Sequence, residues 1–345
     1  MAKIIYGVSG QGFGHSTRSR EILRYLVSKG HQVLVFTYGQ ALFFLQEEFA
    51  VYEIPGLGLS YKNNELSYFD TIYKNTLQLA RQSKNWKKIL NKFRDFNPDL
   101  VITDFESLSA VLAKLQRAPL ISIDNQHQIT NTKIDLPLKY RKDLLADKLV
   151  IKSMVWGAKY YLVTTFFKTL VNKKNTFLFP PILRKEILDL KPQKQDYILV
   201  YQNSNFDHIV NQLRDINQKF VVFGLSKEGV EGNIEFKNYD SHQWLNYLAN
   251  CRAIIGTAGL SLITESLHLA KPYLAVPVKK QIEQVINAYY LEKMGYGLSC
   301  AEFTKKNYWR FMENLPTYDK NLEKYNKADN SAIFHKLDEI IGYWS

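Results

Sequence analysis

Two glycine-rich turns, each lying between an apolar run and a helical pattern, constrain the fold of this 345-residue chain. Residues 3–8 form an apolar, β-branched run, and the turn Gly10-x-Gly12-x-Gly14-His15 leads from it into a helical pattern at 16–29. Residues 253–255 lead in the same way through Gly256-Thr257-Ala258-Gly259 into another helix. A strand, a glycine turn and a helix form the repeating unit of parallel α/β sheets. We therefore predict an α/β protein.

The alternation of strands and helices extends along both halves of the chain. Strands are expected at 3–8, 32–37, 51–54, 100–103, 120–123, 197–201, 220–223 and 253–255, and helices at 16–29, 40–48, 107–117, 206–217 and 243–250. A polar stretch from Pro180-Pro181 to Lys194, which also contains Pro192, indicates a linker, placed at 186–195. We predict an N-terminal Rossmann-like domain at 1–185 and a C-terminal one at 196–345, each doubly wound, with the last helix allowed to return to the first domain.

Polar side chains follow three predicted strands of the first half. His15 comes after the first strand, Asp104 ends another, and Asn125, Gln126 and His127 follow a third. Ligands of open α/β sheets gather at the carboxyl ends of strands, so these groups are expected in one crevice. A helix N-terminus disfavours imidazolium, which leaves the His15 ring available as a base.

The glycine turn of the second half is predicted to bind a diphosphate. A turn that feeds a helix N-terminus exposes unpaired amides, here those of Ala258 to Ser261. Glu265 follows within two helical turns, where a carboxylate can accept the hydroxyls of a ribose, and Glu283 with Gln284 opens a further helix. This ordered set indicates a nucleotide diphosphate sugar. The first turn, in contrast, lacks the G-x-G-x-x-G spacing of dinucleotide-binding enzymes.

At these residues the sequence resembles the GT-B glycosyltransferases, both the group that contains the lipid II-forming N-acetylglucosaminyltransferase and the small-molecule transferases that use UDP-sugars. The resemblance implies a GT-B fold in which His15 is the catalytic base and Asp104 orients it. It also implies an acceptor cleft and a donor site. The expected cleft residues are Gly12, Gly14, Arg18, Asn125, Gln126 and His127, and the expected donor-binding residues are Ser204, Tyr239, Ala258, Gly259, Leu260, Ser261, Glu265, Glu283 and Gln284.

Two assignments within this set stay open. Gln126 and His127 compete with Asp104 for the role of orienting His15 or binding the acceptor. Arg18 either binds a phosphate of the acceptor or completes a helix face.

The net charge of +12 is confined to the first half. Residues 1–195 carry 29 basic and 16 acidic side chains, whereas 196–345 carry 16 and 17. Within the first half, 74–94 has seven basic residues, no acid and an apolar stripe, which suits an anionic membrane surface or plain solubility. No zinc-finger or RNP-type pattern accompanies the charge, so we expect no nucleic acid partner.

Two cysteines make neither a disulfide framework nor a zinc site, and no metal or other cofactor is expected. The start of the chain lacks a signal-peptide pattern, and lysines interrupt the apolar window at 149–171, so we expect a cytoplasmic location, peripheral on the plasma membrane.

These observations lead to one expected function and three alternatives. We expect an inverting, metal-independent glycosyltransferase that moves a sugar from a UDP-sugar to a hydroxyl of a lipid or lipid-linked acceptor. The alternatives are a UDP-sugar 2-epimerase of similar fold, a transferase with a soluble acceptor, and a sugar-nucleotide-binding regulator without catalysis.

Overall fold

The computed structural model describes residues 1–10, 12–56, 61–62, 65–66, 85–201, 207–327 and 329–344. The chain forms two compact units, and each is described by itself. Unit 1 consists of Met1–Arg184 and Asp329–Ser345, and unit 2 of Lys185–Ala328. None of the helices in the described ranges is long and apolar enough to cross a membrane.

Unit 1 consists of strands and helices that alternate along much of its sequence. Its strands are β1 (Lys3–Val8), β2 (Gln32–Thr37), β3 (Val51–Glu53), β4 (Tyr61–Lys62), β5 (Glu65–Leu66), β6 (Leu100–Asp104), β7 (Leu120–Asp124), β8 (Thr132–Lys133), β9 (Tyr160–Thr164), β10 (Leu170–Val171) and β11 (Thr176–Phe179). Its helices are α1 (Phe13–Ser28), α2 (Gly39–Leu45), α4 (Trp86–Phe96), α5 (Ser107–Leu115), α6 (His127–Asn131), the 3-10 turn η2 (Leu138–Tyr140), α7 (Arg141–Met154) and α15 (Ser331–Ile341).

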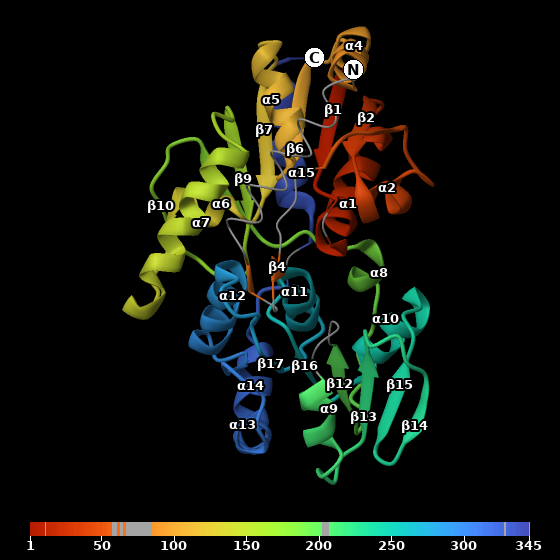
Figure 1. Ribbon diagram of the computed structural model, residues 1–345, viewed down its shortest axis with the longest axis vertical. Helices are drawn as coiled ribbons and strands as arrows, with labels where there is room; N and C mark the ends of the chain where they lie inside the picture. Colours follow the sequence, from red (N-terminus) through yellow and green to blue (C-terminus); the bar gives the residue numbers. More distant parts are fainter. Residues whose placement is uncertain are drawn as a thin grey trace. The chain divides into compact units, whose positions relative to one another are not determined.

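Seven strands of unit 1 form one parallel sheet in the order β11-β9-β7-β6-β1-β2-β3 (Figure 1). β1 pairs with β2 on one side and with β6 on the other, where Val8 is level with Asp104. The order of connection reverses at β1, and a parallel sheet binds ligands at such a switch point, beyond the carboxyl ends of its strands. The ends of β1 and β6 are therefore the place to look for a site.

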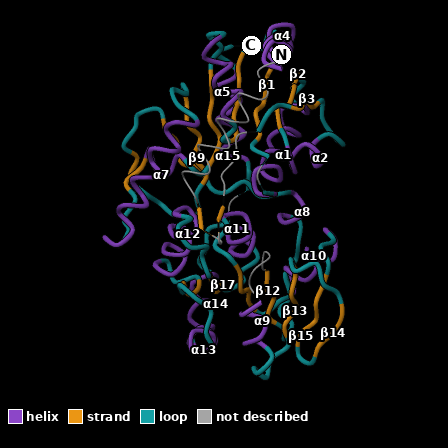
Figure 2. Tube along the Cα trace, viewed as in Figure 1, coloured by secondary structure: helices purple, strands orange, loops and turns teal. Residues whose placement is uncertain are grey.

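Helices cover both faces of this sheet (Figure 2). The core on one face joins the sheet to α1, α2 and α15, and Tyr25 of α1 stacks on Phe334 of α15 at 4.1 Å between ring centroids. α4 and α5 pack on the other face. Gly7 of β1 allows the close approach of α5, because a Cβ at this position would lie 1.9 Å from Oγ of Ser109.

The described part of the basic segment 74–94 contributes to the core of unit 1. In α4, Ile89 and Phe93 are buried, and the Phe93 ring lies 6.5 Å from that of Phe36 in β2. The apolar stripe that suggested a membrane-binding helix is thus turned toward the sheet in α4. Residues 74–84 lie outside the described part of the chain.

Unit 2 repeats the parallel α/β arrangement. Its strands are β12 (Ile198–Tyr201), β13 (Phe220–Phe223), β14 (Gly229–Glu231), β15 (Ile234–Lys237), β16 (Ala253–Gly256), β17 (Tyr273–Ala275) and β18 (Gly297–Ser299). Its helices are α8 (Lys185–Leu188), α9 (Asp207–Leu213), α10 (Ser241–Asn250), α11 (Leu260–His268), α12 (Ile282–Lys293), α13 (Lys305–Glu313) and α14 (Leu315–Leu322).

The sheet of unit 2 has the order β14-β15-β13-β12-β16-β17-β18, and only the β14–β15 pair is antiparallel (Figure 1). Here the switch lies between β12 and β16, whose carboxyl ends, Tyr201 and Gly256, are level with each other. The apolar core joins the strands to α9, α13 and α14. The loop that carries the predicted diphosphate site therefore begins at the switch point.

The unit boundary differs from the predicted one at the linker, whereas the last helix makes the return to the first domain that the prediction allowed. The expected linker at 186–195 lies in unit 2, where Gln193 and Gln195 donate backbone hydrogen bonds to Ala249 and Asn250. The last helix, α15, is part of unit 1, where the hydroxyl of Tyr25 donates to Asp338 at 2.6 Å. Apolar side chains of α15 complete the core beside α1, so this helix leaves the sequence-adjacent unit.

Candidate active site

The predicted polar cluster of unit 1 forms at the ends of β1, β6 and β7. Gly12, with φ of 73°, precedes α1, which begins at Phe13 rather than at the predicted Ser16. His15 therefore lies in the first turn of this helix, next to Gly14. Asp104 is the last residue of β6, and Asn125 directly follows β7.

His15 and Asp104 form a direct pair. His15 Nδ1 lies 2.7 Å from Asp104 Oδ1, and the carboxylate is fully buried. His127, the competing partner, contacts Asp124 instead. The open choice between Asp104 and His127 therefore has a geometric answer: in this structure the partner of His15 is Asp104.

Arg18 is a buried part of this cluster. Its Nε donates to Asp104 Oδ2 at 2.7 Å, its Nη1 donates to Asn125 Oδ1 at 2.6 Å, and its Nη2 donates to Asp104 Oδ1. The hydroxyl of Ser19 adds a hydrogen bond to Asp104 Oδ2 at 2.9 Å. The guanidinium thus links the ends of β6 and β7 to α1. Neither of the two roles predicted for Arg18, phosphate ligand or helix face, describes this arrangement.

These contacts keep Asp104 ionised. Burial by itself would raise the pKa of the carboxyl, but the charge of Arg18 and then that of His15 overcome it, so the pKa of Asp104 is lowered to about 2. An ionised carboxylate accepts four hydrogen bonds here without a proton of its own. Asp104 is consequently an acceptor for the His15 ring at any pH at which the protein would work.

The ionised carboxylate also selects the position of the imidazole proton. Arg18 Nη2 lies 2.9 Å from His15 Nδ1, and a guanidinium only donates. With the proton on Nδ1, the imidazole donates a hydrogen bond to Asp104. With the proton on Nε2, Nδ1 would instead accept a hydrogen bond from Arg18. Since Arg18 already donates to the same Asp104 oxygen, the first arrangement leaves no group unpaired. Among the described residues nothing bonds to Nε2, whose lone pair is then able to accept a proton.

The second histidine–aspartate pair, His127 with Asp124, is held by contacts within the protein on both sides of the imidazole ring. His127 Nδ1 lies 2.7 Å from Asp124 Oδ2, and its Nε2 lies 3.1 Å from the carbonyl oxygen of Val155. Burial would raise the pKa of Asp124, but His127 lowers it on balance. Both ring nitrogens of His127 therefore face acceptors within the protein. The neighbouring Gln126 is also buried, at the start of α6.

The predicted diphosphate loop of unit 2 is held from two sides by α12. Gln284 Oε1 accepts hydrogen bonds from the amides of Ala258, at 3.2 Å, and Val278, at 3.0 Å. Asn287 Nδ2 donates to the carbonyl of Ala258 at 3.0 Å, and the hydroxyl of Tyr273 donates to that of Thr257 at 2.5 Å. This loop is thus fixed before any ligand binds.

The hydrogen bonds change which amides are available to a ligand. The amide of Ala258 is engaged by Gln284, although it was expected at the diphosphate. α11 begins after Gly259 without a side-chain cap, so the amides of Gly259, Leu260 and Ser261 form its open N-terminus. Gln284 holds the loop, a contact that its predicted role in sugar binding did not include.

The remaining predicted donor-site residues differ in how far they are buried. Glu265 is buried on α11, and Glu283 lies half-buried in the first turn of α12. Tyr239 is exposed after β15, with its ring 6.3 Å from that of Trp244. Ser204 lies outside the described residues.

The contacts of Gln284 lead to a stability prediction. Gln284→Leu keeps the size of the side chain but leaves two amides without an acceptor. The cost is about 1–3 kcal/mol for the buried amide of Ala258 and less for the half-buried amide of Val278. We expect a lower melting temperature, measured by differential scanning calorimetry. Gln284→Glu, which retains an acceptor oxygen, should recover part of the loss. Gln281→Leu is the matched control, because the Gln281 side chain does not cap α12; equal losses in Gln281→Leu and Gln284→Leu would contradict the assignment.

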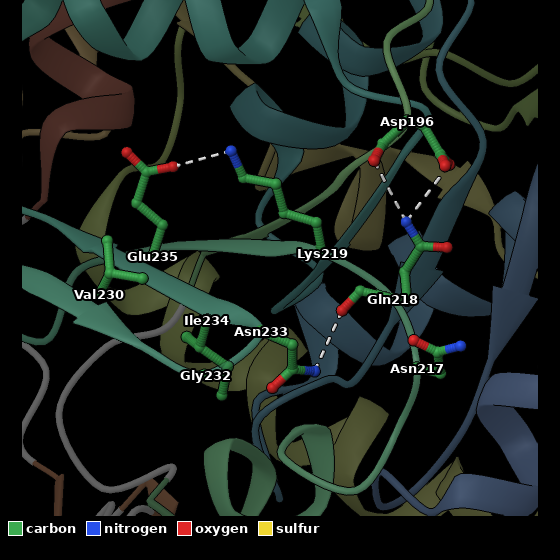
Figure 3. A pocket seen from close by; sticks show the side chains of 9 residues that line it. All are labelled: Asp196, Asn217, Gln218, Lys219, Val230, Gly232, Asn233, Ile234 and Glu235. Carbon is green, nitrogen blue, oxygen red and sulfur yellow. Dashed lines mark hydrogen bonds and ion pairs between the residues drawn. The ribbon is translucent and has the colours of Figure 1, made fainter.

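A cavity elsewhere in unit 2 does not belong to this site. Figure 3 shows it at the amino ends of β12, β13 and β15, the sheet edge opposite the α11 N-terminus. Most of its polar side chains are engaged with one another or with the backbone: Lys219 pairs with Glu235 at 3.1 Å, and Asn233 Nδ2 donates to three carbonyls. Parallel sheets bind ligands at the other edge. In the described part of the chain, no cluster of three or more His, Cys, Asp or Glu side chains could hold a metal ion.

Two contributors to the site were not predicted in their observed roles. Ser19, like Arg18, donates a hydrogen bond to Asp104. Arg18 and Ser19 come three and four residues after His15 on one helix, and this spacing could have predicted that they lie on the same side of the helix as His15. Tyr273 supports the loop from a neighbouring strand. No local pattern identifies such a contact.

Known proteins share both the sequence pattern and the fold. The profile of glycosyl transferase family 1 matches residues 2–316. An uncharacterized glycosyltransferase of Methanosarcina acetivorans is 25% identical over 330 residues, covering 86% of this chain and 84% of that protein. A UDP-N-acetylglucosamine–N-acetylmuramyl-(pentapeptide) pyrophosphoryl-undecaprenol N-acetylglucosamine transferase of Clostridium tetani is 35% identical over 174 residues, 46% of this chain and 48% of that one.

Among solved structures, the glycotransferase of kitacinnamycin superposes with a TM-score of 0.70, covering 98% of both chains at 15% identity. This likeness concerns the fold, which is GT-B, with two parallel-sheet α/β domains. Together with the family profile across nine-tenths of the sequence, it agrees with the resemblance inferred from the two glycine turns. The chain therefore belongs to glycosyl transferase family 1 and is a glycosyltransferase of the GT-B fold.

Proposed function

We propose that this glycosyltransferase transfers a sugar from a UDP-sugar to a hydroxyl of a lipid or lipid-linked acceptor, with inversion at the anomeric carbon and without a metal ion. The observation that carries the proposal is the His15–Asp104 pair, in which a buried, ionised carboxylate holds Nδ1 and leaves Nε2 as the proton acceptor. This is the arrangement of a general base whose tautomer is fixed by a third group.

The proposed reaction needs one proton transfer and one displacement. Nε2 of His15 takes the proton of the acceptor hydroxyl as its oxygen attacks the anomeric carbon. The bond from that carbon to the diphosphate breaks on the opposite face, so the configuration inverts and UDP leaves. In this proposal the charge that develops on the diphosphate is stabilised by the amides of Gly259, Leu260 and Ser261 at the uncapped N-terminus of α11.

The proposed donor and acceptor rest on separate arguments. The Clostridium tetani relative is named for a UDP-sugar donor and an undecaprenol-linked acceptor, and its similarity to this chain extends over less than half of each. The positive charge supports the acceptor class, since 1–195 carry the whole excess of basic residues and an anionic lipid phosphate would be attracted there. Membership of a transferase family weighs against the epimerase and regulator alternatives.

A donor and acceptor screen tests the proposed function. The purified protein is incubated with UDP-glucose, UDP-galactose, UDP-N-acetylglucosamine or UDP-glucuronate, each with and without a lipid extract. We expect UDP release that depends on lipid and a product whose new linkage is inverted, measured by NMR. UDP release that is the same with and without the lipid extract would overturn the acceptor class, and a retained configuration would overturn the mechanism.

A further inference from the structure

The outer face of α7 in unit 1 is formed by leucines and basic residues. At 3.6 residues per turn, Arg141, Lys142, Leu145, Lys148, Leu149 and Lys152 fall within an arc of about 120°. Leu145 is 55% exposed and Leu149 71% exposed. Exposed leucines this large, two on one helix face, are not explained by packing within unit 1.

Two further exposed apolar residues flank the helix in the sequence. Leu138, in the turn before α7, is 83% exposed, and Trp156, two residues after it, is 42% exposed. The indole of Trp156 lies 4.7 Å from Lys114 Nζ. Tryptophan and lysine together are the residues that proteins place at the boundary between lipid and water.

The opposite side of α7 fixes the direction of the outer face. Ile151 is buried against unit 1, as is Val155 directly after the helix. The two acids of the helix, Asp143 and Asp147, fall outside the arc of the leucines. Within the described ranges, none of the four cations in that arc forms an ion pair. The face thus presents four positive charges, two leucines and no acid. Figure 1 shows α7 at the margin of unit 1, extending past the neighbouring elements.

We infer that this face of α7 is a docking surface for an anionic lipid bilayer. The leucines and Trp156 enter the interface between headgroups and acyl chains, and the four cations bind anionic headgroups around them. The inference rests on the proposed function, because docking on a bilayer would bring the enzyme to a lipid acceptor. It places the membrane contact on α7 rather than on α4, whose Ile89 and Phe93 are in the core.

Charge and composition favour a bilayer over the other occupants of such a face. A second copy of the chain would oppose the same four cations to this face, which disfavours a symmetric dimer. A nucleic acid would bind the cations but would leave the leucines in water. A bilayer satisfies both kinds of side chain at once.

Vesicle sedimentation tests the inference without donor or acceptor, so its outcome is separate from that of the transfer assays. The full chain is mixed with sucrose-loaded vesicles of phosphatidylcholine alone or with 30 mol% phosphatidylglycerol. We expect binding to the anionic vesicles only, at least tenfold weaker in 0.5 M than in 0.1 M NaCl. The double variant Leu145→Gln/Leu149→Gln should bind at least tenfold more weakly while melting like the parent protein, because both side chains are exposed.

Phe43→Ser is the matched control. Phe43 is also in unit 1 and 68% exposed, but it lies on α2. The control should bind like the parent protein. Quenching of tryptophan fluorescence by brominated lipid should decrease in Trp156→Phe. Equal binding to neutral vesicles, an absence of binding to either kind, or undiminished binding by the Leu145/Leu149 variant would overturn the assignment.

Discussion

Replacing His15 with alanine is expected to lower the rate of sugar transfer by about 10²- to 10⁴-fold, the usual contribution of a general base. The reason is that Nε2 is the proposed proton acceptor, while Asp104, with its pKa held at about 2, is far too weak a base to replace it. The affinity for UDP should stay within about twofold, because His15 belongs to unit 1 and the diphosphate loop to unit 2. Steady-state kinetics and isothermal titration calorimetry measure the two quantities.

Two further variants separate base catalysis from loss of structure. His15→Gln can still hydrogen-bond to Asp104 but accepts no proton, so it should be as inactive as His15→Ala while melting at a similar temperature. His335→Ala removes an exposed histidine from α15 of the same unit and should leave transfer unchanged. If His15→Gln retained more than a tenth of the turnover, His15 would not be the base.

The sequence was sufficient to predict the strands that position the site. The strands predicted at 3–8, 100–103 and 120–123 match β1, β6 and β7 to within one residue, because a strand buried on both faces is apolar along most of its length. The rule that ligands gather at strand ends then selected His15 and Asp104 together. Their contact needed only the two strands to be neighbours.

The order of the strands in the sheet determines which residue is the partner of His15, a choice that the local sequence pattern left open. Asp104 ends β6, which pairs with β1, whereas His127 follows β7, one strand farther from β1. The sequence contains both aspartate–histidine combinations but not the order β7-β6-β1 that separates them. The return of α15 to unit 1 likewise could not be decided from a local sequence pattern. It depends on contacts such as that of Tyr25 with Asp338, which are more than 300 residues apart in the chain.

Arg18 shows how a residue chosen from the sequence can have contacts in the structure that the sequence did not predict. Its charge near a glycine turn suggested an anionic ligand, and the anion that it binds is the buried carboxylate of Asp104. Asp104 thus has a cationic partner before His15 takes up a proton. The site is therefore built around a buried ion pair.

Replacing Arg18 with methionine is expected to destabilise unit 1 by about 3–5 kcal/mol at neutral pH, the usual cost of leaving a buried charge without its partner. In the parent protein the lowered pKa of Asp104 contributes stability that is complete above about pH 4 and is lost as the pH falls toward 2. Without the guanidinium, burial raises the pKa of this carboxyl. The deficit of the variant should then shrink on acidification from pH 7 to pH 5, because the folded state takes up the proton.

Two comparisons identify the ion pair as the cause. Asp104→Asn in the Arg18→Met background removes the stranded charge and should recover part of the lost stability, so the two substitutions should not be additive. Arg24→Met is the matched control on the same helix, since Arg24 pairs with Glu48 at 2.7 Å on the surface and its loss should cost less than about 1 kcal/mol. Because the chain has two units, hydrogen exchange of peptides from β1, α1 and β6 localises the change. A deficit equal to that of Arg24→Met, or one that grows on acidification, would mean that Arg18 does not compensate the charge of Asp104.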